Sequence, residues 1–404
     1  MGDPKAEMDQ KPDQSLVTST AATEQWGELA TGHKPRPLEW LFEKGIFLTS
    51  LSAILMIFLI FVFVANKAWP IFAGKMTSSK VFTVIPVADM AKHSPQELQQ
   101  YLGVTAEQWK SFDEETRRTL MEVKVEESKE RPNDKDAAIN TTQWRYMLKP
   151  HQWSAYSKPE YIWQPVSNIQ KYNIMPLIIG SLKATLVALL FSFPLALGAA
   201  IYVSQLAGAR TKEWLKPAIE LLAGIPSVVL GFFALIVMAT VLQKTFGYES
   251  RLNAFVAGIA LGLAIIPVVF SIAEDALTSV PRSYTQAALA LGSSKWQAAW
   301  QIVLPAAIPG VFAALVLGFG RAIGETMIVL MASGNASIVS WDVFDSTRTM
   351  TATIAAELAE TVVDGHHYRI LFMIGALLFV VTFFANFIAD VVIHRLKHKL
   401  EGKA

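Results

Sequence analysis

The sequence predicts an all-α integral membrane protein with six transmembrane helices and a polar, helical periplasmic insertion between the first and the second. Hydrophobic residues make up 52% of the 404 residues and charged residues only 17%, whereas ordinary soluble domains carry about a quarter charged residues. Six stretches are apolar over about the length that crosses a bilayer. A long segment rich in Glu, Lys, Gln and Trp separates the first stretch from the second.

The overall composition narrows the classes of function. The formal net charge is only +1, so the sequence lacks the excess of positive charge that would indicate a nucleic-acid partner. The absence of cysteine excludes a disulfide framework, a thiolate metal site and a cysteine nucleophile. Neither His366-His367 nor His394 with His398 has a carboxylate or thiol at ligand spacing, so we predict no metal site.

The chain begins with a polar segment, residues 1–36, which we predict to be a flexible cytoplasmic N-terminus. Residues 37–66 follow as an elbow and the first transmembrane helix. Pro37 to Lys44 mixes aromatic and charged residues, as an interfacial helix does, and Ile46 to Asn66 carries no charge. This apolar run begins too far along the chain, and is too long, for a cleavable signal peptide.

Residues 67–173 form the predicted extracytoplasmic insertion. Two stretches in it favour helices, residues 94–110 and 113–125, and the segment is too long for a bare loop. We therefore expect a small helical lobe. The Trp and Tyr residues between Trp144 and Tyr172 are typical of a membrane surface, and a partner interface is the alternative.

Residues 174–393 contain the other five apolar spans, predicted at 174–203, 217–242, 254–273, 307–331 and 369–393. Gly224, Pro226 and Pro267 interrupt the apolar pattern. Such residues are commonly tolerated in membrane helices, so they indicate either ordinary tolerance or hinges around a translocation path.

The distribution of basic residues predicts the orientation in the membrane. Arg210, Lys212 and Lys216 follow the second span, and residues 394–404 form a basic tail. By the positive-inside bias we expect both termini in the cytoplasm and the insertion outside.

A helical elbow is predicted between the fourth and fifth spans, in the loop 283–306. The run QAALALGSSKWQAAWQIVLP extends from Gln286 to Pro305. Gly292 allows a sharp turn between a short amphipathic helix and a second helix that enters the membrane. The elbow fits either a compact knob for a cytoplasmic partner or a plain pair of interfacial helices.

Two ionisable residues stand inside the fifth span. The run GFGRAIGETMIVLM places Arg321 and Glu325 four residues apart, with Thr326 next, so we expect the two charges to share a helix face. A structural ion pair is one interpretation. In the other, Arg321 offers a forked donor to an oxyanion in transit, and Glu325 orients the guanidinium or accepts a hydrogen bond from a protonated substrate oxygen. Phosphate near neutral pH still carries a proton and sulfate does not, so such an acceptor would favour phosphate.

The elbow resembles the EAA loop of ABC importer permeases. The positions that match the pattern are Ala287, Ala288, Gly292, Ile302, Leu304 and Pro305, while Gln286 replaces the usual Glu. The resemblance implies that this loop is the coupling helix that docks on an ATPase subunit. Because Gln286 is uncharged, a salt bridge is not expected there, although a hydrogen bond remains available.

The run from Gly320 to Met327 is similar to the GRAxGETM element of PstC-type permeases of phosphate ABC importers. Further similar segments are 220–229, 274–277, 280–281, 333–335 and 349–352. This resemblance implies a bacterial inner-membrane permease core over residues 174–393, with Arg321, Glu325 and Thr326 in the substrate pathway. The implied partners are a homologous PstA-type permease, a PstB-type ATPase dimer, an extracytoplasmic phosphate-binding protein and membrane lipid.

The implied activity is transport by alternating access, not catalysis. The sequence lacks a phosphate-cradling G-x-x-x-x-G-K-[ST] loop, so no cofactor is expected in this chain, and ATP and Mg belong to the partner ATPase. The alternatives are a permease for another oxyanion such as sulfate or molybdate, a secondary transporter or channel, and a receptor built on the outer lobe.

Overall fold

The computed structural model describes residues 37–76, 87–129, 136, 139–154, 156–167 and 169–400. They fall into two compact units, one ending at Val62 and the other beginning at Phe63. The predicted flexible N-terminus, residues 1–36, and the end of the predicted basic tail, residues 401–404, lie outside the described residues.

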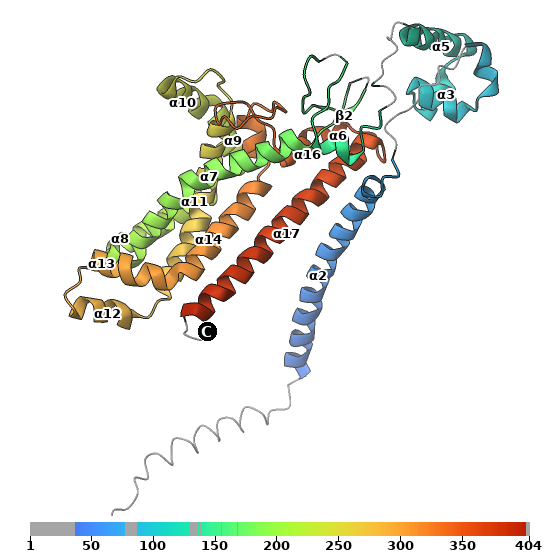
Figure 1. The fold of residues 1–404 in the computed structure, drawn as a ribbon. Helices are drawn as coiled ribbons and strands as arrows, with labels where there is room; N and C mark the ends of the chain where they lie inside the picture. Colours follow the sequence, from blue (N-terminus) through green and yellow to red (C-terminus); the bar gives the residue numbers. More distant parts are fainter. Residues whose placement is uncertain are drawn as a thin grey trace, which may run out of the picture. The chain divides into compact units, whose positions relative to one another are not determined.

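Helix α2 contains the first span and runs without a break from Pro37 to Phe72 (Figure 1). The predicted interfacial elbow is therefore the beginning of the same helix. Gly45 does not end it, because glycine inside a helix costs only ~1 kcal/mol relative to alanine. The most apolar window of α2 has a mean hydropathy of 2.8.

The described residues contain six helical stretches that are long and apolar enough to cross a membrane, which confirms the predicted number. They are Trp40–Phe72, Met175–Leu206, Ser227–Phe246, Ala254–Thr278, Lys295–Gly324 and His366–Leu396. The largest departures from the predicted boundaries are in the third and fifth spans. The third begins at Ser227 rather than at residue 217, and the fifth begins at Lys295 rather than at residue 307 and ends at Gly324 rather than at residue 331.

The third span begins late because a separate helix, α8 (Ala209–Leu222), precedes it. The chain then turns, and Gly224 N donates to Leu221 O at 3.0 Å. Pro226 follows as the N-cap of α9 (Ser227–Phe233), since proline has no N–H with which to continue a helix.

The predicted hinge residues therefore differ in setting. Gly224 and Pro226 lie in the turn between α8 and α9. Pro267 lies inside α11 (Ala254–Thr278), which continues through it.

Three spans contain a π-helical segment, in which the turn is wider than in an α-helix. Helix α7 (Met175–Ile201) continues into η3 (Tyr202–Leu206). Between α9 and α10 (Ala239–Phe246) lies η4 (Ala234–Met238). Between α13 (Lys295–Ala298) and α14 (Leu304–Gly324) lies η5 (Ala299–Val303).

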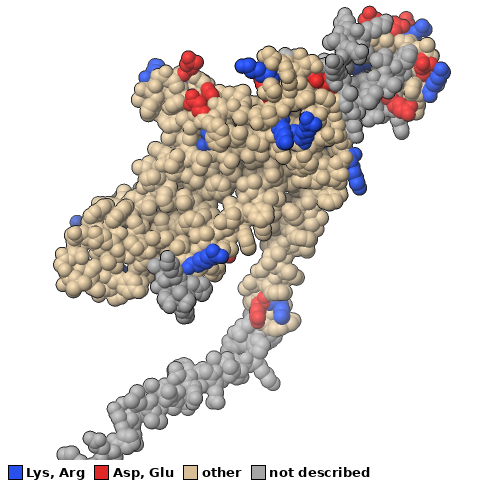
Figure 2. All heavy atoms as spheres, in the orientation of Figure 1, with Lys and Arg blue, Asp and Glu red and all other residues tan. Residues whose placement is uncertain are grey.

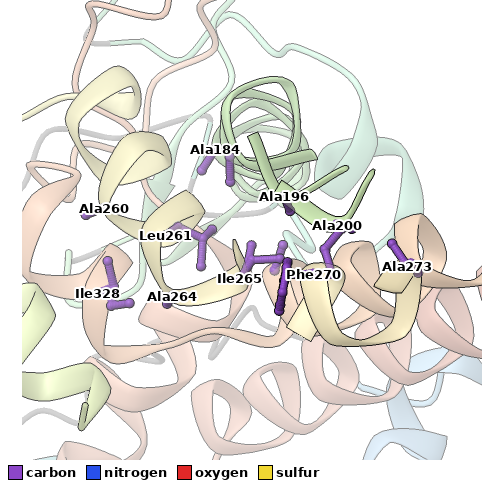
Figure 3. Packing of buried hydrophobic residues seen from close by; sticks show 14 of the residues in the cluster. Ala184, Ala196, Ala200, Ala260, Leu261, Ala264, Ile265, Phe270, Ala273 and Ile328 are labelled. Carbon is purple, nitrogen blue, oxygen red and sulfur yellow. The ribbon is translucent and has the colours of Figure 1, made fainter. Parts of the chain in front are cut away.

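The core of the larger unit lies between α7 and α11, whose facing residues are mostly alanine (Figure 3). Ala184, Ala196 and Ala200 of α7 and Ala260 and Ala264 of α11 are among its buried members. A Cβ added to Gly258 would lie 2.4 Å from Val187 Cγ1. Small residues allow the backbones to approach closely, which is how helices gain packing energy in lipid.

The segments between the fifth and sixth spans are α15 (Met327–Ala332), α16 (Met350–Glu357) and η6 (Leu358–Glu360). The last helix, α17 (His366–Leu400), forms the sixth span. Figure 1 places α16 at one end of the helices and α8, α12 (Arg282–Ala290) and α13 at the other.

The insertion after the first span is largely helical. It contains η1 (Val87–Lys92), α3 (Pro95–Leu102), α4 (Ala106–Ser111), α5 (Glu114–Lys129) and α6 (Trp144–Leu148). The predicted helix over residues 94–110 is two helices, because Gly103 adopts a left-handed conformation with φ of 73°. A short antiparallel pair, β1 (Trp163–Gln164) with β2 (Lys171–Tyr172), was not predicted.

The distribution of charge agrees with a membrane protein. On the face shown in Figure 2, charged side chains gather over the insertion and the loops, and the surface along the helical spans carries few.

Candidate functional site

The fifth span breaks at the predicted pathway residues. Helix α14 ends at Gly324, and Glu325 is extended, with φ of −69° and ψ of 135°. Thr326 follows, and α15 begins at Met327. Because the helix ends between them, Arg321 and Glu325 do not share a helix face, and the ion pairs of the described residues include none between the two. The expectation of a shared helix face is therefore wrong, and the described residues do not show the ion pair that one of the two interpretations required.

Glu325 is half-buried and is held from two sides. Its carboxylate Oε1 accepts a hydrogen bond from Met327 N at 3.2 Å. Its main-chain carbonyl accepts one from Thr351 Oγ1 at 2.8 Å. The Thr326 hydroxyl donates back to Gly324 O at 3.4 Å. The break is therefore stabilised by its own side chains and by α16.

Four hydroxyl side chains lie beside Glu325, around the same small gap. They belong to Ser181 and Thr185 of α7 and to Thr349 and Thr351 at the start of α16. Together with Glu325 and five apolar residues, Ala184, Leu261, Ala322, Ile323 and Val329, they line a narrow gap. In this conformation the gap is too narrow to hold a water molecule. The Ser181 hydroxyl accepts from Met350 N at 2.9 Å, so α7 and α16 are joined at this point.

These hydroxyl residues were not predicted as site residues. Ser181 and Thr185 stand four residues apart in an apolar helix, which puts both on one face. That spacing is the signal that could have identified them. Thr349 and Thr351 contributed only to the family resemblance, without a role.

Arg321 lies in the last turn of α14 and is exposed. Within the described part of the chain no carboxylate pairs with it and no hydrogen bond occupies its guanidinium. The structure therefore brings Glu325, Thr326 and the hydroxyl residues together. The side chain of Arg321 stays exposed on the surface of this chain.

The predicted elbow is present. Helix α12 ends at Ala290, and Gly292 turns the chain with φ of 88°, a conformation that favours glycine. Ser294 then begins α13 with a capping box, in which Ser294 Oγ accepts from Gln297 N at 3.2 Å. Through η5 the helix continues into α14, so the elbow leads directly into the fifth span.

The members of the predicted coupling segment have different environments. Ala288 is buried and anchors α12, whereas Gln286, Ala287 and Gly292 are exposed. In the segment after the turn, where η5 leads into α14, Ile302 and Pro305 are exposed and Leu304 is half-buried. The Trp296 and Trp300 rings stack with centroids 5.8 Å apart and remain exposed. The elbow thus presents a mixed polar and aromatic surface on a rigid turn.

The fold defines a multi-pass helical membrane protein, and comparison with known proteins specifies its class. The family described as "Binding-protein-dependent transport system inner membrane component" matches residues 192–398, just over half of the chain. The chain belongs to this family. It is therefore an ABC transporter permease, a multi-pass protein of the inner membrane and a transport subunit rather than an enzyme.

Two curated relatives agree with this assignment. The "Probable ABC transporter permease protein YqgH" of Bacillus subtilis is 35% identical over 222 residues, covering 55% of this chain and 72% of the relative. The "Phosphate transport system permease protein PstC" of Xylella fastidiosa is 33% identical over 257 residues, covering 59% and 78%. A solved structure titled "Inward facing conformations of the MetNI methionine ABC transporter" is 17% identical, with a TM-score of 0.44 over 55% of this chain and 97% of that chain.

Proposed function

We propose that this chain is the PstC-type permease subunit of an ATP-driven importer of inorganic phosphate. The observation that carries the proposal is the break in the fifth span, which combines an exposed Arg321 with a fixed Glu325 carboxylate. The relatives named as PstC phosphate transport permeases support this class of substrate.

The setting of Arg321 supports a role in anion transport. Arg321 stands in the last turn of the fifth span, and an ionisable side chain within a membrane span normally pairs with another group or lines a water-filled cavity. This chain supplies no carboxylate for it among the described residues. A homologous PstA-type subunit would complete the pathway on this face, and the forked guanidinium would bind two oxygens of a tetrahedral anion.

Glu325 would provide selectivity. Its carboxylate accepts one hydrogen bond, from Met327 N, and has remaining acceptor capacity. A phosphate that still carries a proton donates to such an acceptor, whereas sulfate has no proton to offer and is repelled. Thr326 would lie beside the path, where its hydroxyl stabilises the break by donating to Gly324 O at 3.4 Å.

Coupling would occur through the elbow, residues 286–305. A PstB-type ATPase dimer, which binds ATP and Mg, would dock on it and drive alternation between outward-open and inward-open states. A phosphate-binding protein would deliver the substrate from the outside. In this arrangement the insertion faces outward, and both termini lie in the cytoplasm.

The test uses the four-component complex in proteoliposomes, with ATP supplied on the side of the ATPase. Arg321→Gln should lower phosphate uptake by at least about tenfold, since a charged hydrogen bond contributes roughly 1.5–3 kcal/mol. Glu325→Gln should reduce the preference for phosphate over sulfate. Arg210→Gln and Glu249→Gln, at exposed positions outside the site, are the matched controls.

Three results would contradict the proposal. Unchanged uptake and unchanged anion preference in both site variants would remove the assigned roles. A wild-type complex that imports sulfate or molybdate but not phosphate would make the chain a permease for another oxyanion. Transport by the purified chain alone, driven by an ion gradient, would indicate a secondary transporter or channel.

A further inference from the structure

A buried carboxylate joins two helices at the elbow end of the bundle. Glu274 of α11 is 1% exposed. Its Oε2 lies 2.7 Å from Lys216 Nζ, and its Oε1 lies 3.1 Å from Lys212 Nζ, both on α8. Thr278 Oγ1 donates to Oε1 at 3.0 Å. One acid therefore accepts from two lysines and a hydroxyl.

This arrangement adds a polar contact to the limited packing of α8. Helix α8 has no fully buried residue, and its Leu215 and Ile219 pack against the core while only partly buried. Lys212 and Lys216 stand four residues apart on one face, where like charges repel unless an acid lies between them. The hydrogen bond to Glu274 raises the pKa of the Lys216 ammonium, which keeps it charged. Asp275, 3.7 Å from Lys216 Nζ and 74% exposed, is a weaker neighbour.

The clamp formed by Glu274, Lys212 and Lys216 lies on a continuous path between the elbow and Glu325. On one side, α11 ends at Thr278, and α12 of the elbow begins at Arg282. On the other side, α8 leads through the turn at Gly224 into α9.

Helix α9 in turn contacts the segment that follows Glu325. A Cβ added to Gly231 would lie 3.2 Å from Ile328 Cα and 3.2 Å from Met327 O of α15. Such close backbone contact transmits displacement, because packed interiors deform little. Helix α15 begins two residues after Glu325.

We propose that the clamp makes α8 and α11 move as one body, so that a displacement of the elbow reaches α15 and Glu325 through α9. Glu274 is a positioning residue, since it acts through these helices and does not contact the substrate. The inference rests on the proposed function, because it requires an ATPase that moves the elbow.

The experiment measures phosphate uptake and ATP hydrolysis on the same proteoliposomes, using the complete complex. The wild type is assayed first, and a wild type without ATP-driven phosphate import would refute the proposed function before any variant is examined. Glu274→Gln should then lower the phosphate imported per ATP by about tenfold or more, within the usual range of coupling energies, while hydrolysis continues. Asp275→Asn, the exposed neighbour, should keep the wild-type ratio.

A reversible crosslink between α8 and α11 distinguishes a role of the clamp in coupling from a role in folding alone. The sequence contains no cysteine, so Lys212→Gln, Lys216→Cys and Glu274→Cys combined introduce the only two thiols of the chain. A cleavable bis-methanethiosulfonate reagent, as long as the two lost side chains, then joins α8 to α11. Linking should restore the ratio of phosphate to ATP to at least about half of the wild type, and reduction should abolish it again.

Two outcomes would overturn the inference. One is a wild-type ratio in Glu274→Gln or in the unlinked triple variant. The other is a linked triple variant whose ratio stays as low as that of the unlinked form. If Glu274→Gln does not assemble into the complex, the test rests on the triple variant, whose ratio of phosphate to ATP is compared before and after the link is reduced.

Discussion

Thr351 Oγ1 donates a hydrogen bond of 2.8 Å to the main-chain carbonyl of Glu325, joining residues 26 positions apart. Helix α14 ends just before Glu325, so this carbonyl lies in an extended residue outside the helix. Thr351 Oγ1 also lies 3.2 Å from Oγ1 of Thr349, and Thr349 is the residue that caps α16. The start of α16 therefore determines the conformation of the break.

Replacing Thr351 tests this connection. Thr351→Val keeps the shape but leaves the Glu325 carbonyl without its donor, which should cost about 1–3 kcal/mol of stability. Phosphate uptake should fall with it because Glu325 loses its fixed position. Thr351→Ser, which retains the hydroxyl, should remain close to wild type in both thermal unfolding and uptake. Equal behaviour of the two variants would contradict the role of the hydroxyl.

Gly180 should tolerate no side chain. A Cβ at this position would lie 2.2 Å from Arg348 O and 2.6 Å from Thr347 Oγ1. Gly180→Ala must therefore displace the main chain that leads into α16, and we expect a loss of about 1–3 kcal/mol, as in other overpacked sites. Gly198→Ala on the same helix meets nothing within 4 Å and should be neutral or stabilising. The melting temperatures of the two purified variants give the comparison.

Lys183 joins the loop between α15 and α16 to α7. Its buried ammonium donates to Ser340 O at 3.1 Å and to Asp342 O at 2.8 Å. Lys183→Met keeps the length of the side chain and removes both hydrogen bonds, which are worth roughly 1.5–3 kcal/mol each when one partner is charged. Amide hydrogen exchange over residues 338–346 should accelerate by at least about tenfold. Lys244→Met, at the exposed end of α10, should leave this exchange unchanged.

Glu357 connects the insertion to the permease core. Its carboxylate lies 2.6 Å from Arg348 Nη2 and 3.1 Å from His367 Nε2, and it accepts from Trp163 Nε1 at 3.1 Å. Glu357→Leu leaves a mostly buried arginine without its acid and should cost about 3–5 kcal/mol. Trp163→Phe removes the indole donor but leaves the ion pair between Glu357 and Arg348, and should cost only about 0.5–1.5 kcal/mol. Thermal unfolding in detergent checks the order, and equal losses would contradict it.

The sequence predicted those features that depend on local composition. Apolar length alone indicates a span, because a bilayer has one thickness, and the six spans follow from it. The elbow was predictable for a similar reason, since Gly292 adopts a backbone conformation that other residues avoid.

The rest depends on contacts between distant segments. Nothing near Glu325 except Gly324 predicts that the fifth span stops there, and the donor that holds the break comes from Thr351. Likewise Glu274 appeared only as part of a family motif, because its partners lie 58 and more positions away on α8. The spacing along the chain also did not predict the carboxylate beside His367, since Glu357 belongs to another helix.

The two π-helical segments that have α-helix on both sides, Ala234–Met238 and Ala299–Val303, have a practical consequence for choosing sites of chemical labelling. Each wide turn adds one residue to its helix, which rotates everything beyond it by about 100° relative to an unbroken α-helix. A single helical wheel drawn through either segment would therefore assign the wrong side chains to lipid on one side of the wide turn. Spin labels and crosslinkers should be placed from a separate wheel for each half.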